Sequence, residues 1–240
     1  MKNAKKYIRK NSTLAELVIL SLGIILVFFP NSNMIVSNIG ASIIASSIVI
    51  FMTDVLIGKE SNESVVQWGL EAVYKTRGEM NSSCDEYLKK AKNLDIIAFG
   101  LKSWRDSQQT QIETILQSGG TIRIITMKPG CANLKARERD EFEQDDGISH
   151  SIEQLIVWAK TQNDKGYKGK IEVRCHDHLP LDFLYLMDNR LFTGPYVYGK
   201  GSQQTVSFEY SNTCSAYEYY KDYFNELWND EAFCQNALKT

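Results

Sequence analysis

The residues best suited to chemistry are two histidines, His176 and His178, which flank Asp177 and precede Asp182 and Asp188. Residues two apart on an extended strand point to the same face, so the two imidazoles would lie side by side. Imidazole and carboxylate groups bind zinc and act as acids or bases in phosphodiester hydrolysis. No third strong ligand stands at a diagnostic spacing. The pattern therefore favours a structural or ligand-contacting role for the pair over catalysis or metal binding.

A second candidate group is basic and aromatic. Lys102, Trp104 and Arg105 follow the strand predicted over residues 94–100, at the carboxyl edge where α/β sheets usually bind ligands. Basic residues of later strands would join them in one pocket, although solvated surface charge explains the same residues. The candidate binding residues are Lys102, Trp104, Arg105, Arg123, Lys128, Arg174, His176 and His178.

Composition narrows the function classes. The chain has 240 residues, with 27 Lys and Arg against 29 Asp and Glu, which excludes nucleic-acid binding through bulk charge. Its five cysteines include no CxxC pair, and their odd number argues against a disulfide framework and a zinc knuckle. The sequence predicts no cofactor, no metal site and no catalytic residue.

The first sixty residues are far more apolar than the rest. A basic segment, residues 1–10, precedes an apolar run over 14–29, a polar turn over 30–33 and a second apolar run over 34–57. Helices over about 12–29 and 34–57 would form a transmembrane hairpin within residues 1–60. The first apolar run would span roughly 24 Å and the second roughly 36 Å, against a hydrocarbon core of ~30 Å.

Two other interpretations of this segment stay open, a buried helical hairpin of a soluble protein and a cleaved signal peptide. A signal peptide fits less well, because no A-x-A-like site precedes Pro30 and the second apolar run would be unexplained. Basic residues favour the cytoplasmic side, and two crossings return the chain to that side. We therefore expect a protein of the bacterial inner membrane with both termini in the cytoplasm.

The second apolar run has small residues at helical spacing, which allow helices to approach closely in lipid. Close packing within the hairpin explains them, and so does self-association of several hairpins into a homo-oligomer. The candidate packing residues are Gly40, Ala41, Ser42, Ala45 and Ser46.

The remaining sequence predicts an α/β unit. We expect a connecting helix over 61–82 and a domain over 83–240, which a capping pattern of Ser83 and Glu86 would open. Strands alternate with helices at first and then follow one another directly, which is typical of a mixed sheet flanked by helices. The predicted strands are 94–100, 121–129, 170–177, 181–188, 190–198 and 204–210, and the predicted helices are 84–93, 104–120, a segment around 151–160, and 215–230.

From about Leu94 to Trp228 the order of these elements resembles one half of the phospholipase D fold. The sequence segments that support the resemblance are IIAFG, SGGTIRIITMKPG, LMDNRLFTGPYVYG and YFNELW. Active members carry a histidine and a lysine, HxK, on the strand before an aspartate. With that aspartate placed on Asp188, Leu181 and Phe183 occupy the two positions, and Gly194 is followed by proline where the family has serine. The resemblance implies a scaffold without its catalytic groups, and hence not an enzyme.

A degenerate phospholipase D-like domain on a membrane hairpin is similar to the two-transmembrane effectors of retrons, which belong to antiphage abortive-infection systems. That resemblance implies a hairpin that disrupts the inner membrane when the cytoplasmic domain is released or triggered. It also implies inhibition by a complex of a reverse transcriptase with RNA and DNA. The alternatives are a membrane-tethered phosphodiesterase or nuclease using His176, His178 and Asp188, a passive membrane adaptor, and activation by a cyclic nucleotide.

Overall fold

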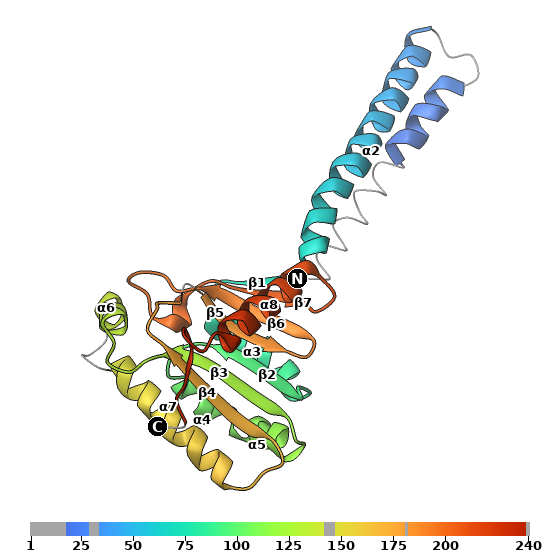
Figure 1. Cartoon of the computed structure of the whole chain (residues 1–240). Helices are drawn as coiled ribbons and strands as arrows, with labels where there is room; N and C mark the ends of the chain where they lie inside the picture. The colour runs from blue at the N-terminus through green and yellow to red at the C-terminus, as the bar shows by residue number, and fades with distance from the viewer. Residues whose placement is uncertain (1–17, 29–33, 142–146, 181, 239–240) are drawn as a thin grey trace. The chain divides into compact units, whose positions relative to one another are not determined.

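The chain forms two compact units, Met1–Val65 and Val66–Thr240, in a computed structural model that describes residues 18–28, 34–141, 147–180 and 182–238 (Figure 1). The first unit contains a helix over Val18–Phe28 and most of α2 (Met34–Trp68). Leu181, the position of the family histidine, and residues 12–17 and 29 of the first predicted membrane helix lie outside the described residues.

Within the first unit the two helices meet at a pair of glycines. A Cβ atom on Gly40 would lie 2.8 Å from the carbonyl oxygen of Gly23 and 2.9 Å from the Val27 backbone nitrogen. Only glycine allows the two helices to approach this closely, so Gly40 serves their packing within this unit. The other predicted packing residues, Ala41, Ser42, Ala45 and Ser46, are exposed within this unit.

One described helix is long and apolar enough to cross a membrane. The segment Met34–Met52 provides 19 residues for such a span, whereas the apolar helix Val18–Phe28 is shorter. Large apolar side chains on both helices are exposed, including Leu22, Ile25, Ile39 and Phe51. The apolar character predicted for this segment is thus present in one candidate membrane helix near the N-terminus.

The second unit is built on a mixed sheet of eight strands in the order β1-β7-β6-β5-β2-β3-β4-β8. Strands β2, β3 and β4 are parallel, and the other neighbouring pairs are antiparallel. The predicted mixed α/β class is confirmed. The strands are β1 (Leu70–Tyr74), β2 (Asn93–Ile97), β3 (Thr121–Met127), β4 (Lys170–His176), β5 (Asp182–Met187), β6 (Arg190–Pro195), β7 (Ser207–Ser211) and β8 (Gln235–Asn236).

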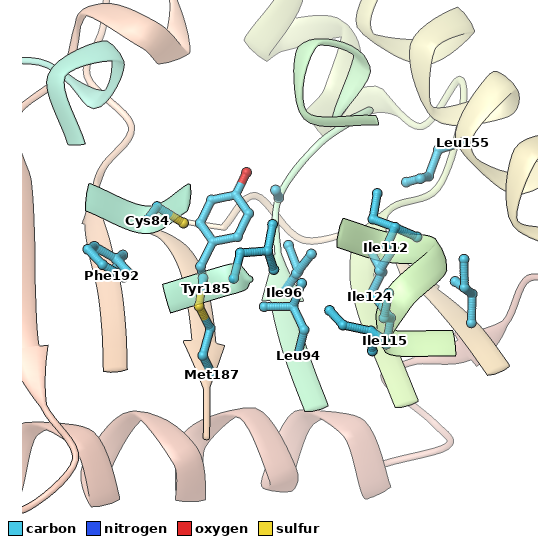
Figure 2. Packing of buried hydrophobic residues seen from close by; sticks show 14 of the residues in the cluster. Cys84, Leu94, Ile96, Ile112, Ile115, Ile124, Leu155, Tyr185, Met187 and Phe192 are labelled. Atoms are coloured by element: carbon cyan, nitrogen blue, oxygen red, sulfur yellow. The ribbon is translucent and has the colours of Figure 1, made fainter. Parts of the chain in front are cut away.

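Helices cover both faces of this sheet (Figure 1). Alternate residues of β2 and β3 point to opposite faces, so Ile96 and Ile124 pack against α3, α5 and α7, whereas Ile97 and Ile125 pack against α8. Figure 2 shows the first of these clusters. The helices are α3 (Arg77–Leu88), α4 (Lys102–Ser107), α5 (Gln109–Gln117), α6 (Ala132–Asp140), α7 (Gly147–Asp164) and α8 (Ser215–Asn229), with a short 3₁₀ turn over Ser202–Gln204.

The segment predicted as one connecting helix over 61–82 is helical only at its two ends, which belong to α2 and α3. Helix α2 continues to Trp68, and Gly69, with φ +75°, ends it in the left-handed conformation typical of a residue just past a helix. The next five residues form β1, which pairs with β7. This five-residue run, LEAVY, is too short to separate a strand from a helix by periodicity.

Helix α3 also begins earlier than the predicted capping residue Ser83. The side chain of Thr76 accepts a hydrogen bond from the backbone N–H of Glu79 at 3.2 Å, so Thr76 is the N-cap. Ser83 lies inside the helix and donates to Glu209 at 3.0 Å. The sequence TRGE contains the true capping signal, and it places Arg77 in the first turn.

Three further elements differ from prediction. The helix predicted over 104–120 is divided at Gln108, whose buried amide donates to Asp85 at 2.6 Å. Helix α6 forms in the charged stretch that had no predicted element, because Leu134 and Arg137 are buried there. The short edge strand β8 pairs with β4 through Arg174 and Cys175.

Candidate ligand-binding cavity

A cavity of about 470 Å³ lies at the carboxyl end of β2, the edge at which α/β sheets usually bind ligands. Its wall is assembled from segments far apart in the chain: the start of α3, the loop after β2, the start of α7, and the segment between β6 and β7. The wall includes Arg77, Phe99, Trp104, Glu141, Tyr185 and Tyr196.

Arg77 is the most unusual residue of this wall. It is 4 % exposed, and its guanidinium carbon lies 3.9 Å from the ring centroid of Phe183 and 5.2 Å from that of Tyr185. The Nη2 atom donates a hydrogen bond to the Tyr185 hydroxyl at 2.9 Å. Guanidinium groups stack well on aromatic faces. The rings of Phe183 and Tyr185 on β5 therefore hold the guanidinium of Arg77, which comes from α3.

No carboxylate balances this charge within the described parts of the chain, where Arg77 forms no ion pair. The nearby phenols cannot replace one. Burial raises the pKa of Tyr185 and raises that of Tyr196 to about 12, so both stay protonated near neutral pH. Arginine keeps its proton in proteins, and buried charges are normally paired. Arg77 therefore carries a positive charge that the described residues leave uncompensated.

The carboxylate of Glu141 also lines the cavity, but it already has a cationic partner. Arg137 donates from Nε to Glu141 at 2.7 Å, and the hydroxyl of Ser202 donates to the same oxygen at 3.4 Å. The two side chains of this pair are only 4 % and 5 % exposed. The Arg137–Glu141 pair is therefore neutral as a whole. The net positive charge of the cavity wall comes from Arg77 and from the exposed Lys102.

Two other wall residues have unused hydrogen-bonding groups. The buried Tyr196 hydroxyl and the buried Trp104 indole N–H have no hydrogen bond of standard geometry within the described residues. Leu101, in the same wall, has φ +53°, a left-handed conformation that costs a non-glycine residue roughly 1–2 kcal/mol. Backbone strain of this kind is found most often at binding and catalytic sites.

The single basic pocket predicted from the sequence is not formed. Lys102 and Trp104 line the cavity, and Arg105, on the same helix, donates instead to the carbonyl of Gln154 at 3.4 Å. Arg123 and Arg174 lie against α8 on the other face of the sheet. Strand alternation decides this outcome, because Arg123 shares its face with Ile125 and not with Ile124. The backbone N–H of Lys128 donates to the carbonyl of His176, away from the cavity wall.

The predicted histidine pair has an aromatic partner. The rings of His176 and His178 both stack on Phe233, with centroids 5.0 Å and 4.9 Å away. Burial lowers the pKa of His176 to about 4, so this imidazole is neutral at physiological pH. In the described ranges, no group of three or more His, Cys, Asp or Glu side chains gathers where a metal ion could bind.

Asp188 lies at the opposite end of β5 from the cavity. Its carboxylate accepts hydrogen bonds from the backbone N–H of Lys92 and from the side chain of Asn93, at the start of β2. Because β2 and β4 are both parallel to β3, His176 at the end of β4 and Asp188 lie at opposite edges of the sheet. The alternative site of His176, His178 and Asp188 is therefore not assembled.

Sequence reasoning missed Arg77, Tyr185 and Tyr196, the residues that define the site. Arg77 lies more than a hundred positions before both tyrosines in the chain, and the misassigned connecting helix hid its position. The capping pattern TRGE was the available signal, because it predicts a helix that begins at Arg77.

No protein-family model matches the sequence, and no curated protein matches it either. Two solved structures are similar to the chain at low identity. TrmBL2, an archaeal chromatin protein with a described mode of DNA binding, has 14% identity and a TM-score of 0.42, over 78% of this chain and 68% of that chain. Phosphatidylserine synthase of Haemophilus influenzae Rd KW20 has 13% identity and a TM-score of 0.46, over 66% of this chain and 36% of that chain.

The chain thus spans about a third of the length of the synthase. At these TM-scores neither similarity assigns a family or an activity to the chain.

Proposed function

We propose that this protein is a membrane-anchored bacterial effector whose α/β unit binds a ligand or partner without hydrolysing it and controls the apolar N-terminal helices. One observation carries the proposal: Arg77 stacks at 3.9 Å on Phe183, the position at which the phospholipase D resemblance places the family lysine. A buried cation from α3 lies against that position, but the reactive groups are absent.

The surroundings of Phe183 support binding without hydrolysis. Its side chain is fully buried, and a Cβ atom on Gly194 of the neighbouring strand would lie 2.9 Å from its ring. The Thr193 hydroxyl donates to the Phe183 carbonyl at 2.6 Å, which fixes the strand locally. A phenyl group offers neither a nucleophile nor a proton donor for phosphoryl transfer.

The first unit supports the membrane part of the proposal. The second membrane crossing would be Met34–Met52, and the helix Val18–Phe28 would belong to the first. Asn38, Ser42 and Ser46 line a groove on this unit together with Ile19. Polar side chains on a helix surface within lipid gain stability by meeting another helix, which favours self-association of the hairpins at the inner membrane.

Defence against phage is the biological role we propose. In this scheme a complex of a reverse transcriptase with RNA and DNA holds the protein inactive, and loss of that complex allows the hairpins to disrupt the membrane. The support is the combination of an apolar N-terminal unit with an α/β unit that lacks the HxK groups.

The test is membrane potential, followed with a voltage-sensitive dye in bacteria that express the full chain without any partner. We expect depolarisation by the wild type. Leu22→Arg, which places a charge on a side chain that is 54% exposed in the apolar unit, should abolish it. Val157→Arg is the matched control, since Val157 is 64% exposed on α7.

A double variant, His178→Ala with Asp188→Asn, tests the hydrolytic alternative. We expect it to depolarise the membrane as the wild type does. Loss of depolarisation in this variant, at normal expression, would favour an enzyme. A wild type that causes no depolarisation at any expression level would favour a passive adaptor.

A further inference from the structure

We propose that the cavity binds a small phosphate-bearing molecule of mononucleotide size, with its phosphoryl group on Arg77. The inference rests on the proposed function, because it names the class of ligand that the α/β unit would recognise. Three properties of the wall lead to it: uncompensated charge, convergent hydrogen-bond donors, and size.

The charge requires an anion. Arg77 is 4 % exposed, and its close contacts are with the rings of Phe183 and Tyr185 and with the Tyr185 hydroxyl. A buried cation without a counter-ion is unfavourable, whereas a guanidinium with an oxyanion forms charge-assisted hydrogen bonds. An anionic ligand would supply the missing partner.

The donors favour a phosphoryl group over a carboxylate. The Tyr185 hydroxyl accepts from Arg77, which leaves its own proton available to a ligand. The Tyr196 hydroxyl, in the same wall, has no partner of standard geometry in the described residues. The guanidinium and two hydroxyls offer more donors than the two oxygens of a carboxylate can use well. A phosphate monoester has three terminal oxygens and a charge near −2, and exposed Lys102 adds a second cation to the wall.

The remaining wall has the size and chemistry for an organic group on that phosphate. A volume of about 470 Å³ falls within the range of small-molecule sites. Phe99 and Tyr196 form a tilted aromatic pair, with centroids 4.6 Å apart, against which a flat ring can pack. Ser103, Ser202 and Gln203 supply hydroxyl and amide groups that suit a sugar. Inorganic phosphate alone would leave most of this volume unused.

The experiment is isothermal titration calorimetry on the full chain in detergent micelles. The probes are adenosine monophosphate (AMP), inorganic phosphate and adenosine, at constant ionic strength. We expect AMP to bind more tightly than inorganic phosphate by tenfold or more, and adenosine to bind more weakly than AMP. Arg77→Met should lower the affinity for AMP at least tenfold. Arg105→Met is the matched control, because Arg105 lies on α4 outside the cavity wall, and its affinity should equal that of the wild type.

A buried substitution can unfold a protein, so a second variant removes a single atom. Tyr196→Phe keeps the ring and deletes the hydroxyl, and we expect several-fold weaker binding of AMP with an unchanged circular-dichroism spectrum. The proposal is overturned if the folded wild type binds neither AMP nor phosphate. It is also overturned if Arg77→Met and Tyr196→Phe both bind AMP as the wild type does.

This result can be separated from the membrane result. Depolarisation without binding of any probe would overturn the ligand class and leave the membrane effector standing. Binding of AMP that depends on Arg77, in a protein that never depolarises the membrane, would overturn the effector and support the site.

Discussion

Two arginines on opposite faces of the same sheet have different surroundings. Arg123, on the α8 face, donates from Nε and Nη2 to the two oxygens of Asp95, both at 2.6 Å, and from Nη2 to Asn225 at 3.1 Å. Its guanidinium carbon lies 4.9 Å from the Phe224 ring centroid. Arg77 has a closer aromatic contact and one hydrogen bond, but no carboxylate in the described residues.

The difference shows that aromatic rings can fix the position of a guanidinium group without balancing its charge. Stacking positions a guanidinium, yet only an anion balances its charge. Arg123 has its anion inside the fold and is explained as part of the structure. Arg77 has the same positioning without the anion, so its position is better explained by something that binds. This contrast leads to predictions of decreasing size.

The largest effect should come from Arg123→Met, which leaves the Asp95 carboxylate, 14 % exposed, without its cation. We expect a loss of about 4 kcal/mol in the free energy of unfolding. Arg77→Met should change it by no more than about 1 kcal/mol, because removing an uncompensated charge offsets the lost stacking. Urea unfolding followed by tryptophan fluorescence measures both, since all four tryptophans belong to the second unit. The reverse order of the two losses would contradict the comparison.

His176 is buried like Arg77 but behaves differently, because an imidazole can release its proton and become neutral, whereas a guanidinium stays charged. Its pKa is about 4 in the folded protein against 6.5 in the unfolded chain, so the unfolded state binds the proton first as the pH falls. Stability should therefore decline from about pH 6.5 towards pH 4, by up to about 3 kcal/mol.

The measurement is urea unfolding at a series of pH values. His176→Gln should remove most of this decline, and His178→Gln, on a side chain 67% exposed, should not. An equal decline in the wild type and His176→Gln would show that other groups control acid stability.

Gly69→Ala tests how firmly the chain before Arg77 is fixed to the sheet. An alanine Cβ would lie 2.3 Å from the Cβ atom of Cys214, in a backbone with φ +75°. We expect a loss of about 2 kcal/mol in the free energy of unfolding, and a lower affinity for AMP if β1 shifts.

Gly166→Ala is the matched control, because Gly166 has φ +72° but nothing within 4 Å of the added atom. It isolates the backbone cost of a left-handed residue, about 1 kcal/mol. Equal losses in the two variants would show that the contact with Cys214 relaxes freely.

The smallest effect should come from Asp188→Asn, at the end of β5 remote from Phe183. The amide keeps an acceptor for the Lys92 backbone N–H, so we expect a loss of about 1 kcal/mol and no change in AMP affinity. Calorimetry and urea unfolding check the two parts. A large loss of AMP affinity would mean that this end of β5 belongs to the binding site.

The sheet was largely predictable from the sequence, and the cavity was not. The strand predicted over 181–188 contains the continuous apolar run FLYLM, and the strand predicted over 121–129 is rich in isoleucine and follows two glycines, which are both clear local signals. The cavity depends on where distant segments meet: α3, the loop after β2, and the segment after β6. No periodicity encodes that meeting, and the histidine pair that drew attention lies outside the cavity wall.

The apolar character of the N-terminal unit was predictable from the sequence, but the end of its second helix was not. The run of apolar residues from Met34 predicts a membrane helix, but nothing in that run marks its end at Trp68 rather than near 57. The end is set by Gly69 and by the pairing of β1 with β7, which are features of the second unit.

A crystal structure of the full chain grown with AMP tests the contrast between the two arginines most directly. We expect the phosphoryl oxygens within hydrogen-bond distance of Arg77 and of the Tyr196 hydroxyl, while Arg123 keeps its contacts to Asp95 and Asn225. A nucleotide bound at Arg123 or elsewhere, or a carboxylate of the chain paired with Arg77, would contradict it.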